Sequence, residues 1–219
     1  MHGVRPYKSL DDLPQTLAIF PLAGALLLPR GHLPLNIFEP RYLAMVDAAL
    51  SGNRLIGMIQ PVEPEADATK PALSAVGCAG RITGYRETED GRYLITLTGI
   101  CRFRIGRELA ADTPFRQIEP DFAAFARDLL FDEAGPFPRE RLLAALRHYL
   151  AHRDLKADWE SAVSAPAETL VNAVAMLCPF EPAEKQALLE APGWSERVET
   201  LITLLKMAGA ETSGGTTLN

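Results

Sequence analysis

The chain has 219 residues, with 47% hydrophobic and 23% charged side chains and a net charge of −6. This composition is typical of a globular protein and excludes a chain that is disordered throughout. The longest nearly apolar stretch, residues 17–29, is too short to span a bilayer and is broken by Pro21 and Gly24. We therefore expect no membrane partner.

The N-terminus and the cysteines both favour a cytoplasmic location. Residues 1–14 contain neither an apolar core nor a small-residue cleavage site, so we expect no signal peptide. An odd number of widely spaced cysteines favours reduced thiols over a disulfide framework: Cys78, Cys101 and Cys178.

Charge and glycine divide the chain into two parts. Residues 1–119 carry 13 basic and 13 acidic side chains and 11 of the 16 glycines, whereas residues 120–219 carry the whole net charge. Glycine-punctuated sequence indicates strands, and sequence rich in Ala and Leu indicates helices. We predict an α+β protein with a β-rich subdomain over 1–119, a helical subdomain over 120–208 and a disordered tail over 209–219.

The first part reads mostly as short strands. Apolar runs predict strands over 17–20, 25–28 and 54–60, and Pro34 with Pro40 predicts an extended segment over 33–39. Pro40 suits the first position of a helix, which Gly52 ends. Residues 61–73 contain three prolines and three acidic residues, so we expect an exposed loop there.

A hairpin follows the expected loop. The turn 89–91 contains Asp-Gly between strands predicted over 79–86 and 92–98. After Gly99, residues 100–107 alternate, which places Cys101 and Phe103 on one face and Arg102 and Arg104 on the other.

The second part predicts five helices. Their expected ranges are 121–132, 139–152, 166–177, a segment beginning at 182, and 195–207 with Ser195 as N-cap.

Three stretches in this order resemble one known family. They are Phe20-Pro21-Leu22 with Ile37-Phe38-Glu39-Pro40-Arg41-Tyr42, then Gly99-Ile100-Cys101-Arg102-Phe103, and finally Glu184-Lys185-Gln186-Ala187-Leu188-Leu189-Glu190. The series resembles the N-terminal, substrate-binding domain of the Lon protease family, from about residue 17 to residue 206. The resemblance implies a PUA-like β-rich pseudobarrel followed by a helical bundle.

The sequence contains no motif for the chemistry that Lon proteases perform. It has no Gly-Lys pair and hence no phosphate-binding loop, no Gly-x-Ser-x-Gly elbow, and no sequence that matches a peptidase domain. We therefore expect a stand-alone, Lon-N-like protein that is not an enzyme and uses no cofactor.

The resemblance implies a module that binds unfolded or extended polypeptide, as an adaptor or assembly factor for an ATP-dependent protease or a chaperone. The candidate peptide-binding residues are Leu33, Leu35, Ile37, Phe38, Glu39, Arg41 and Tyr42. Burial of the apolar members and helix-capping or pairing roles for the others are the structural alternative. An open strand edge would add backbone hydrogen bonds to a client, and a homodimer would cover the same segment.

Two other sites have weaker support. Six arginines against three acidic residues over 81–107 suggest an RNA-binding alternative through Arg92, Arg102 and Arg104, although few aromatic residues are interleaved for base stacking. His148 and His152 share one helical face, but nothing in the sequence completes a metal site, so we expect none.

Overall fold

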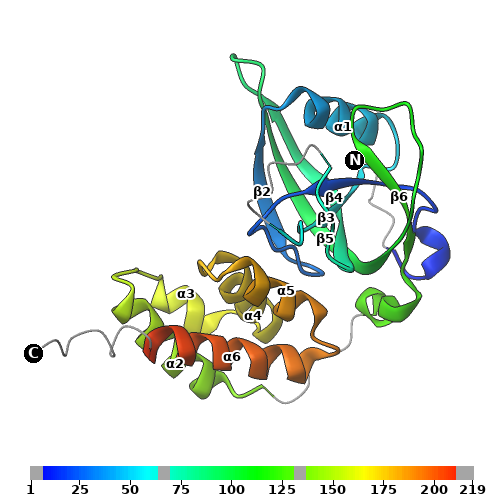
Figure 1. The fold of residues 1–219 in the computed structure, drawn as a ribbon. Coiled ribbons are helices and arrows are strands. Elements are labelled where there is room, and N and C mark those ends of the chain that lie inside the picture. The colour runs from blue at the N-terminus through cyan, green and yellow to red at the C-terminus, as the bar shows by residue number, and fades with distance from the viewer. Residues whose placement is uncertain (1–6, 64–69, 131–136, 211–219) are drawn as a thin grey trace, which may run out of the picture. The chain divides into compact units, whose positions relative to one another are not determined.

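The computed structural model describes residues 7–63, 70–130 and 137–210. The chain forms two compact units, Met1–Phe131 and Asp132–Asn219 (Figure 1). The expected tail beyond residue 210 and residues 64–69 of the expected loop lie outside the described residues.

The first unit is built on a six-stranded sheet that closes on itself. The strand order is β2-β5-β4-β3-β1-β6, and β5 also pairs with β6. Only the β1–β3 pair is parallel among the described strands. This arrangement confirms the α+β class and the β-rich pseudobarrel. The strands are β1 (Leu17–Pro21), β2 (His32–Ile37), β3 (Leu55–Ile59), β4 (Val76–Glu87), β5 (Tyr93–Glu108) and β6 (Arg116–Asp121).

Strand β5 has two parts with different neighbours. Residues 93–98, which we call the hairpin half, pair with β2, whereas residues 104–108 pair with β6. The expected break at Gly99 is wrong, because β5 continues through it. A Cβ at Gly99 would collide with the carbonyl of Leu28, so glycine here allows the preceding segment to approach β5 closely.

The segment before β2 differs from a second prediction. Residues 25–28 were expected to form a strand, but the structure has no strand there. Leu26, Leu27 and Leu28 are nevertheless buried. The carbonyl of Leu28 lies against Gly99, and Arg30 donates its backbone N–H to the carbonyl of Gly99.

The barrel core depends on glycines beside one aromatic ring. Phe103 is fully buried. A Cβ at Gly77 would lie 2.5 Å from the Phe103 ring, and one at Gly57 would lie 3.0 Å from it. The two glycines therefore make room for the largest side chain of β5 in the core.

Helix α1 (Pro40–Ser51) follows β2, as the two prolines predicted. Pro40 occupies the first turn, and Gly52 is the C-cap. Met45 and Val46 are fully buried on its inner face. A short helix, η1 (Leu10–Asp12), precedes β1.

The division between the units comes later than the expected boundary at 119/120. β6 pairs with β1 and β5, and the segment η2 (Ala123–Leu129) contacts β5, so both belong to the barrel unit. The helix expected over 121–132 is this shorter 3-10 segment. Asp128 fixes η2 to β5 through Arg102, as described below, which explains why the first unit extends to Phe131.

The second unit contains five helices among its described residues. They are α2 (Arg139–His152), α3 (Trp159–Ser164), α4 (Ala167–Leu177), α5 (Pro182–Glu190) and α6 (Trp194–Ala210). All but α3 were expected, and α6 begins at Trp194, so Ser195 lies inside its first turn. Arg139 explains α3, because its guanidinium donates to three carbonyls at the end of that helix, including that of Ala165 at 2.7 Å.

Across the described ranges, no helix has the length and apolar character needed to cross a membrane.

Candidate functional site

The structure separates the candidate peptide-binding residues into buried and exposed groups. Ile37 and Tyr42 are buried, at 2% and 7% exposure, whereas Phe38 is 62% exposed. Leu33 and Leu35 are half-buried on β2. The segment therefore does not form one continuous surface, and Phe38 is its most accessible apolar side chain.

The charged members of the segment pair with each other. Glu39 and Arg41 form an ion pair at 2.8 Å, with both side chains about two-fifths exposed. The Arg41 guanidinium also lies over the Tyr42 ring, 4.5 Å from its centroid. The Tyr42 ring packs against Phe20 with centroids 4.2 Å apart. Packing and pairing thus fix these three residues, as the structural alternative expected.

Aromatic side chains gather where the β4–β5 hairpin passes β2. Tyr85 and Tyr93 form an edge-to-face pair with centroids 5.1 Å apart. Arg92 lies 5.8 Å from the Phe38 ring centroid. The nearby Asp47 carboxylate, with burial and Tyr85 adding to its effect, raises the pKa of Tyr93 to about 12. The Tyr93 phenol is therefore neutral near neutral pH.

A shallow hollow of about 500 Å³ lies across β2, β5 and β4. The strand register forms it from three rows: Leu35–Ile95–Tyr85, Pro34–Thr96–Gly84 and Asn36–Leu94–Arg86. Gly84 contributes no side chain to the row of Pro34 and Thr96, which leaves space in the hollow. Tyr85 is 44% exposed. We call the hollow together with Phe38 the hairpin surface.

Strand β2 offers an open edge beside the hairpin surface. Among the described residues β2 pairs with β5 alone, so its other edge has no strand partner. Pro34 lies within this strand and has no N–H to donate. A proline at an edge limits uncontrolled pairing but leaves the other backbone groups available to an extended chain.

The structure argues against the RNA-binding alternative at its central residue. Arg102 is buried and binds Asp128 through two side-chain bonds of 2.8 Å. The backbone N–H of Arg102 donates to the same carboxylate at 3.0 Å. The expectation that Arg102 and Arg104 share an exposed face is therefore wrong, because η2 covers the side of β5 on which Arg102 lies.

The other two arginines do not make a joint surface. Arg92 pairs with Asp90 at 2.9 Å near the hairpin turn. Arg104 lies twelve residues further along β5, roughly 40 Å of extended strand. With Arg102 inside the protein, the three side chains cannot follow one nucleic-acid backbone.

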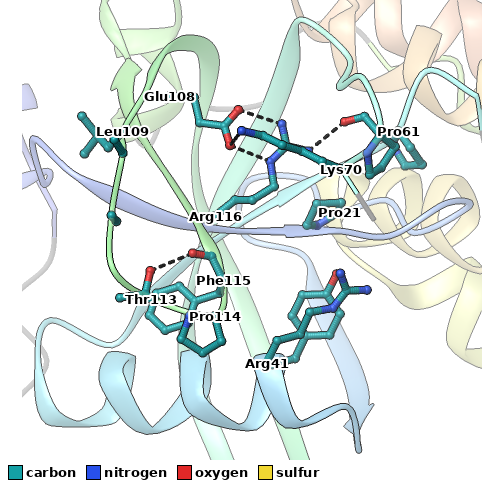
Figure 2. A pocket seen from close by; sticks show the side chains of 14 residues that line it. Pro21, Arg41, Pro61, Lys70, Glu108, Leu109, Thr113, Pro114, Phe115 and Arg116 are labelled. Atoms are coloured by element: carbon teal, nitrogen blue, oxygen red, sulfur yellow. Dashed lines mark hydrogen bonds and ion pairs between the residues drawn. The ribbon is translucent and has the colours of Figure 1, made fainter. Parts of the chain in front are cut away.

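A second pocket, of about 400 Å³, lies beside α1 and the start of β6 (Figure 2). Glu108 binds Arg116 through paired bonds of 3.0 and 2.9 Å and Lys70 at 3.0 Å. The Arg116 hydrogen bonds hold the pKa of Glu108 below its ordinary value, with Lys70 contributing in the same direction. The remaining Arg116 nitrogen donates to the carbonyl of Pro71 at 2.8 Å.

The histidine pair and the cysteines do not form a reactive site in the structure. His152 Nδ1 lies 2.8 Å from the carbonyl of His148. The described residues include no group of three His, Cys, Asp or Glu side chains that could hold a metal ion. Burial raises the pKa of Cys101 to about 12 and that of Cys178 to about 11, so both thiols stay protonated.

The sequence did not predict the contacts that three residues make in the structure. Tyr85 reads as an ordinary strand residue, and only the register places it beside Leu35. Asp128 lies in a segment predicted to be a helix, and no sequence pattern there indicates that it binds the buried Arg102. Glu108 ends a strand, and its binding to Arg116 depends on the β5–β6 pairing that the sequence did not predict.

Comparison with known proteins places the chain in one family. A family model for the ATP-dependent protease La (LON) substrate-binding domain matches residues 16–207. Lon protease from Desulfosudis oleivorans is 32% identical over 119 residues, which are 53% of this chain and 14% of that protein. Lon protease 2 from Thermus thermophilus is 24% identical over 201 residues, which are 89% of this chain and 24% of that protein. The chain thus spans a quarter or less of these relatives.

Solved structures share the fold. The Lon N-terminal domain protein from Xanthomonas campestris has a TM-score of 0.59 at 24% identity, covering 86% of this chain and 97% of that one. The N-terminal domain of Mycobacterium avium complex Lon protease has a TM-score of 0.59 at 18% identity, covering 87% and 97%. At these identities the likeness concerns the fold alone. Since the family match extends over most of the sequence and the architecture agrees with it, the chain belongs to the family of the LON substrate-binding domain.

Proposed function

We propose that this protein is a non-catalytic module that binds exposed apolar segments of other polypeptides through the hairpin surface. The observation that carries the proposal is the exposed aromatic and aliphatic surface beside an open strand edge, in a chain of a substrate-binding family. Phe38 and Tyr85 are large side chains that remain exposed in the folded protein, and exposed apolar side chains are typical of binding surfaces.

Two interactions would act together in this binding. An extended client adds to the open edge of β2, where backbone hydrogen bonds give affinity without sequence preference. Alternate client side chains then enter the hollow across β2, β5 and β4. Burial of each large apolar side chain contributes about 1.5–3 kcal/mol before the cost of ordering the client. We expect weak binding that favours aromatic and aliphatic segments.

The proposal extends to the partner that receives the client. In this view the module presents bound segments to an ATP-dependent protease or a chaperone. A homodimer through β2 would hide Phe38 and compete with clients. Sedimentation equilibrium of the purified protein, with and without a bound polypeptide, measures that competition.

Fluorescence anisotropy with a labelled, reduced and carboxymethylated α-lactalbumin tests the binding itself. We expect saturable binding that survives a rise from 50 to 500 mM salt, because apolar contacts are not screened. The double variant Phe38→Ser/Tyr85→Ser should weaken binding by about tenfold or more, since it removes both exposed aromatic rings.

A matched control comes from the other unit. Leu177 on α4 is 78% exposed and lies beside an apolar hollow of about 500 Å³ in the helical unit. Leu177→Ser removes a more exposed apolar side chain from the other unit and should leave the affinity unchanged. If Leu177→Ser weakens binding and the hairpin variant does not, the binding surface is in the helical unit and the proposed site is wrong.

A further inference from the structure

The pocket beside α1 contains an unusual hydroxyl group. Tyr42 is only 7% exposed and lines this pocket. Its ring is held between Phe20 and the Arg41 guanidinium. Across the described residues its hydroxyl makes no hydrogen bond. The oxygen is not sealed in the core, so it is accessible to an acceptor in the pocket that Tyr42 lines.

Charged groups lie near that hydroxyl. Burial raises the pKa of Tyr42, Arg41 and Arg116 act in the opposite direction, and the Glu39 carboxylate adds to the rise. The phenol therefore stays protonated near neutral pH and offers a proton to an acceptor in the pocket. Arg41 has one nitrogen, Nη1, with no hydrogen bond to any described residue, because its other contacts go to Glu39.

The charges near the pocket leave an excess of cation. Arg116 and Lys70 share the single carboxylate of Glu108 (Figure 2). Arg41 is balanced by Glu39, which does not line the pocket. A small anion that entered would meet the Tyr42 hydroxyl and the free Arg41 nitrogen without displacing an existing pair. Charge-assisted bonds of this kind are among the stronger ones in proteins.

The remaining walls are apolar. Pro21, Pro61, Pro114 and Phe115 line the pocket, and Figure 2 shows their rings around the same opening as Arg41. The volume of about 400 Å³ accommodates a group of one or two side chains. The pocket thus combines one polar corner with hydrocarbon surface.

We propose that this pocket binds a carboxylate carried on a small apolar or aromatic group, with Tyr42 and Arg41 as its hydrogen-bond donors. Two sources present this chemistry: the C-terminal end of a polypeptide with an apolar last residue, and a free small carboxylic acid. The pocket is separate from the hairpin surface in its residues, so this inference goes beyond the proposed function.

Paired probes test the proposal. The first pair is fluorescein-Gly-Ala-Ala-Leu-Phe with a free carboxylate and the same peptide ending in an amide, compared by anisotropy. The second pair is hippurate and its neutral amide, hippuramide, compared by calorimetry. We expect the acid of at least one pair to bind about tenfold or more tightly than its amide, as a charge-assisted bond predicts. Tighter binding of the peptide than of hippurate identifies a chain end, and the reverse identifies a free acid.

Variants assign the binding to the pocket. Tyr42→Phe removes one oxygen and retains the ring against Phe20, and Arg41→Gln removes the cation. Each should bring acid binding down to the amide level. Arg92→Gln, a change at an exposed arginine of the same unit, should not alter it. Thermal denaturation checks that each variant is folded.

Two results would overturn the inference. One is equal affinity of acid and amide in both pairs. The other is acid binding that survives Tyr42→Phe and Arg41→Gln in folded protein. Neither result bears on the hairpin surface, because α-lactalbumin binding depends on Phe38 and Tyr85 and should be unaffected by the Tyr42 and Arg41 changes.

Discussion

The two halves of strand β5 differ in what covers them. Residues 99–108, which we call the barrel half, lie within the closed sheet and under η2, and they bury Cys101, Arg102 and Phe103. The hairpin half pairs with β2, whose outer edge is open among the described strands. Both halves contribute core residues, Ile95 and Leu97 in the hairpin half and Phe103 in the barrel half, but only the hairpin half lies beside the open edge of β2.

The largest expected effect lies in the barrel half, at Asp128. Replacing Asp128 with alanine leaves the Arg102 guanidinium buried without its carboxylate, which should lower the free energy of unfolding by about 3–5 kcal/mol. Urea denaturation followed by circular dichroism measures this change.

A second variant identifies the cause of that loss. Arg102→Leu added to Asp128→Ala removes the buried charge and should recover part of the stability. A double variant that is no more stable than Asp128→Ala would show that the loss comes from packing of η2 and not from an unpaired cation.

The next largest loss of stability is expected at the glycines beside Phe103. Gly77→Ala places a methyl group 2.5 Å from the Phe103 ring and 2.6 Å from the carbonyl of Met58. Overpacking of this kind should cost about 1–3 kcal/mol. Adding Phe103→Leu should relieve part of the clash with the ring. Gly91→Ala is a poor control because Gly91 has a positive φ of 78°. Ala111→Gly is the better control, because it changes the side chain by one methyl group at a position outside the core.

The ion pair of Glu108 at the end of β5 predicts that the stability of the fold depends on pH. The pKa of Glu108 is lowered chiefly by Arg116, so its pairing stabilises the fold above the pKa of the unfolded chain and is lost as pH falls through the lower folded pKa. Glu108→Gln should cost about 1–2 kcal/mol at pH 7, and the difference from the unmodified protein should shrink toward acidic pH. Urea midpoints between about pH 7 and pH 3 follow it. A difference that stays constant over this range would contradict the pairing.

Local sequence patterns predicted the helices and strands better than they predicted which segment covers each face of a strand. Proline and glycine positions predicted both ends of α1, apolar spacing predicted α2, and Pro179 and Pro182 predicted the end of α4 and the start of α5, because these signals act within a few residues. Alternation placed Arg102 opposite Phe103 but carried no information about η2, which buries that side through Asp128. Alternation describes two faces of a strand and does not say whether either faces water.

The candidate sites illustrate the same limit. The sequence motif containing Phe38, Arg41 and Tyr42 is continuous, yet Arg41 and Tyr42 line the pocket beside α1 and Phe38 does not. That pocket also needs Glu108 and Arg116, which are more than sixty residues away in sequence. No spacing rule connects them, because only the closure of β5 on β6 brings them to α1.

The smallest expected effect on stability is at Phe38, in the hairpin half, and it is the most informative. Because Phe38 is 62% exposed, Phe38→Ala should change the free energy of unfolding by about 0.5 kcal/mol or less. The matched change at the buried ring, Phe103→Ala, should cost about 3–5 kcal/mol. The two substitutions remove the same atoms from neighbouring parts of one barrel, so the contrast isolates the effect of covering. A large loss for Phe38→Ala would mean that Phe38 is buried in solution, by a second copy of the chain or by another segment, and is therefore not available to a client.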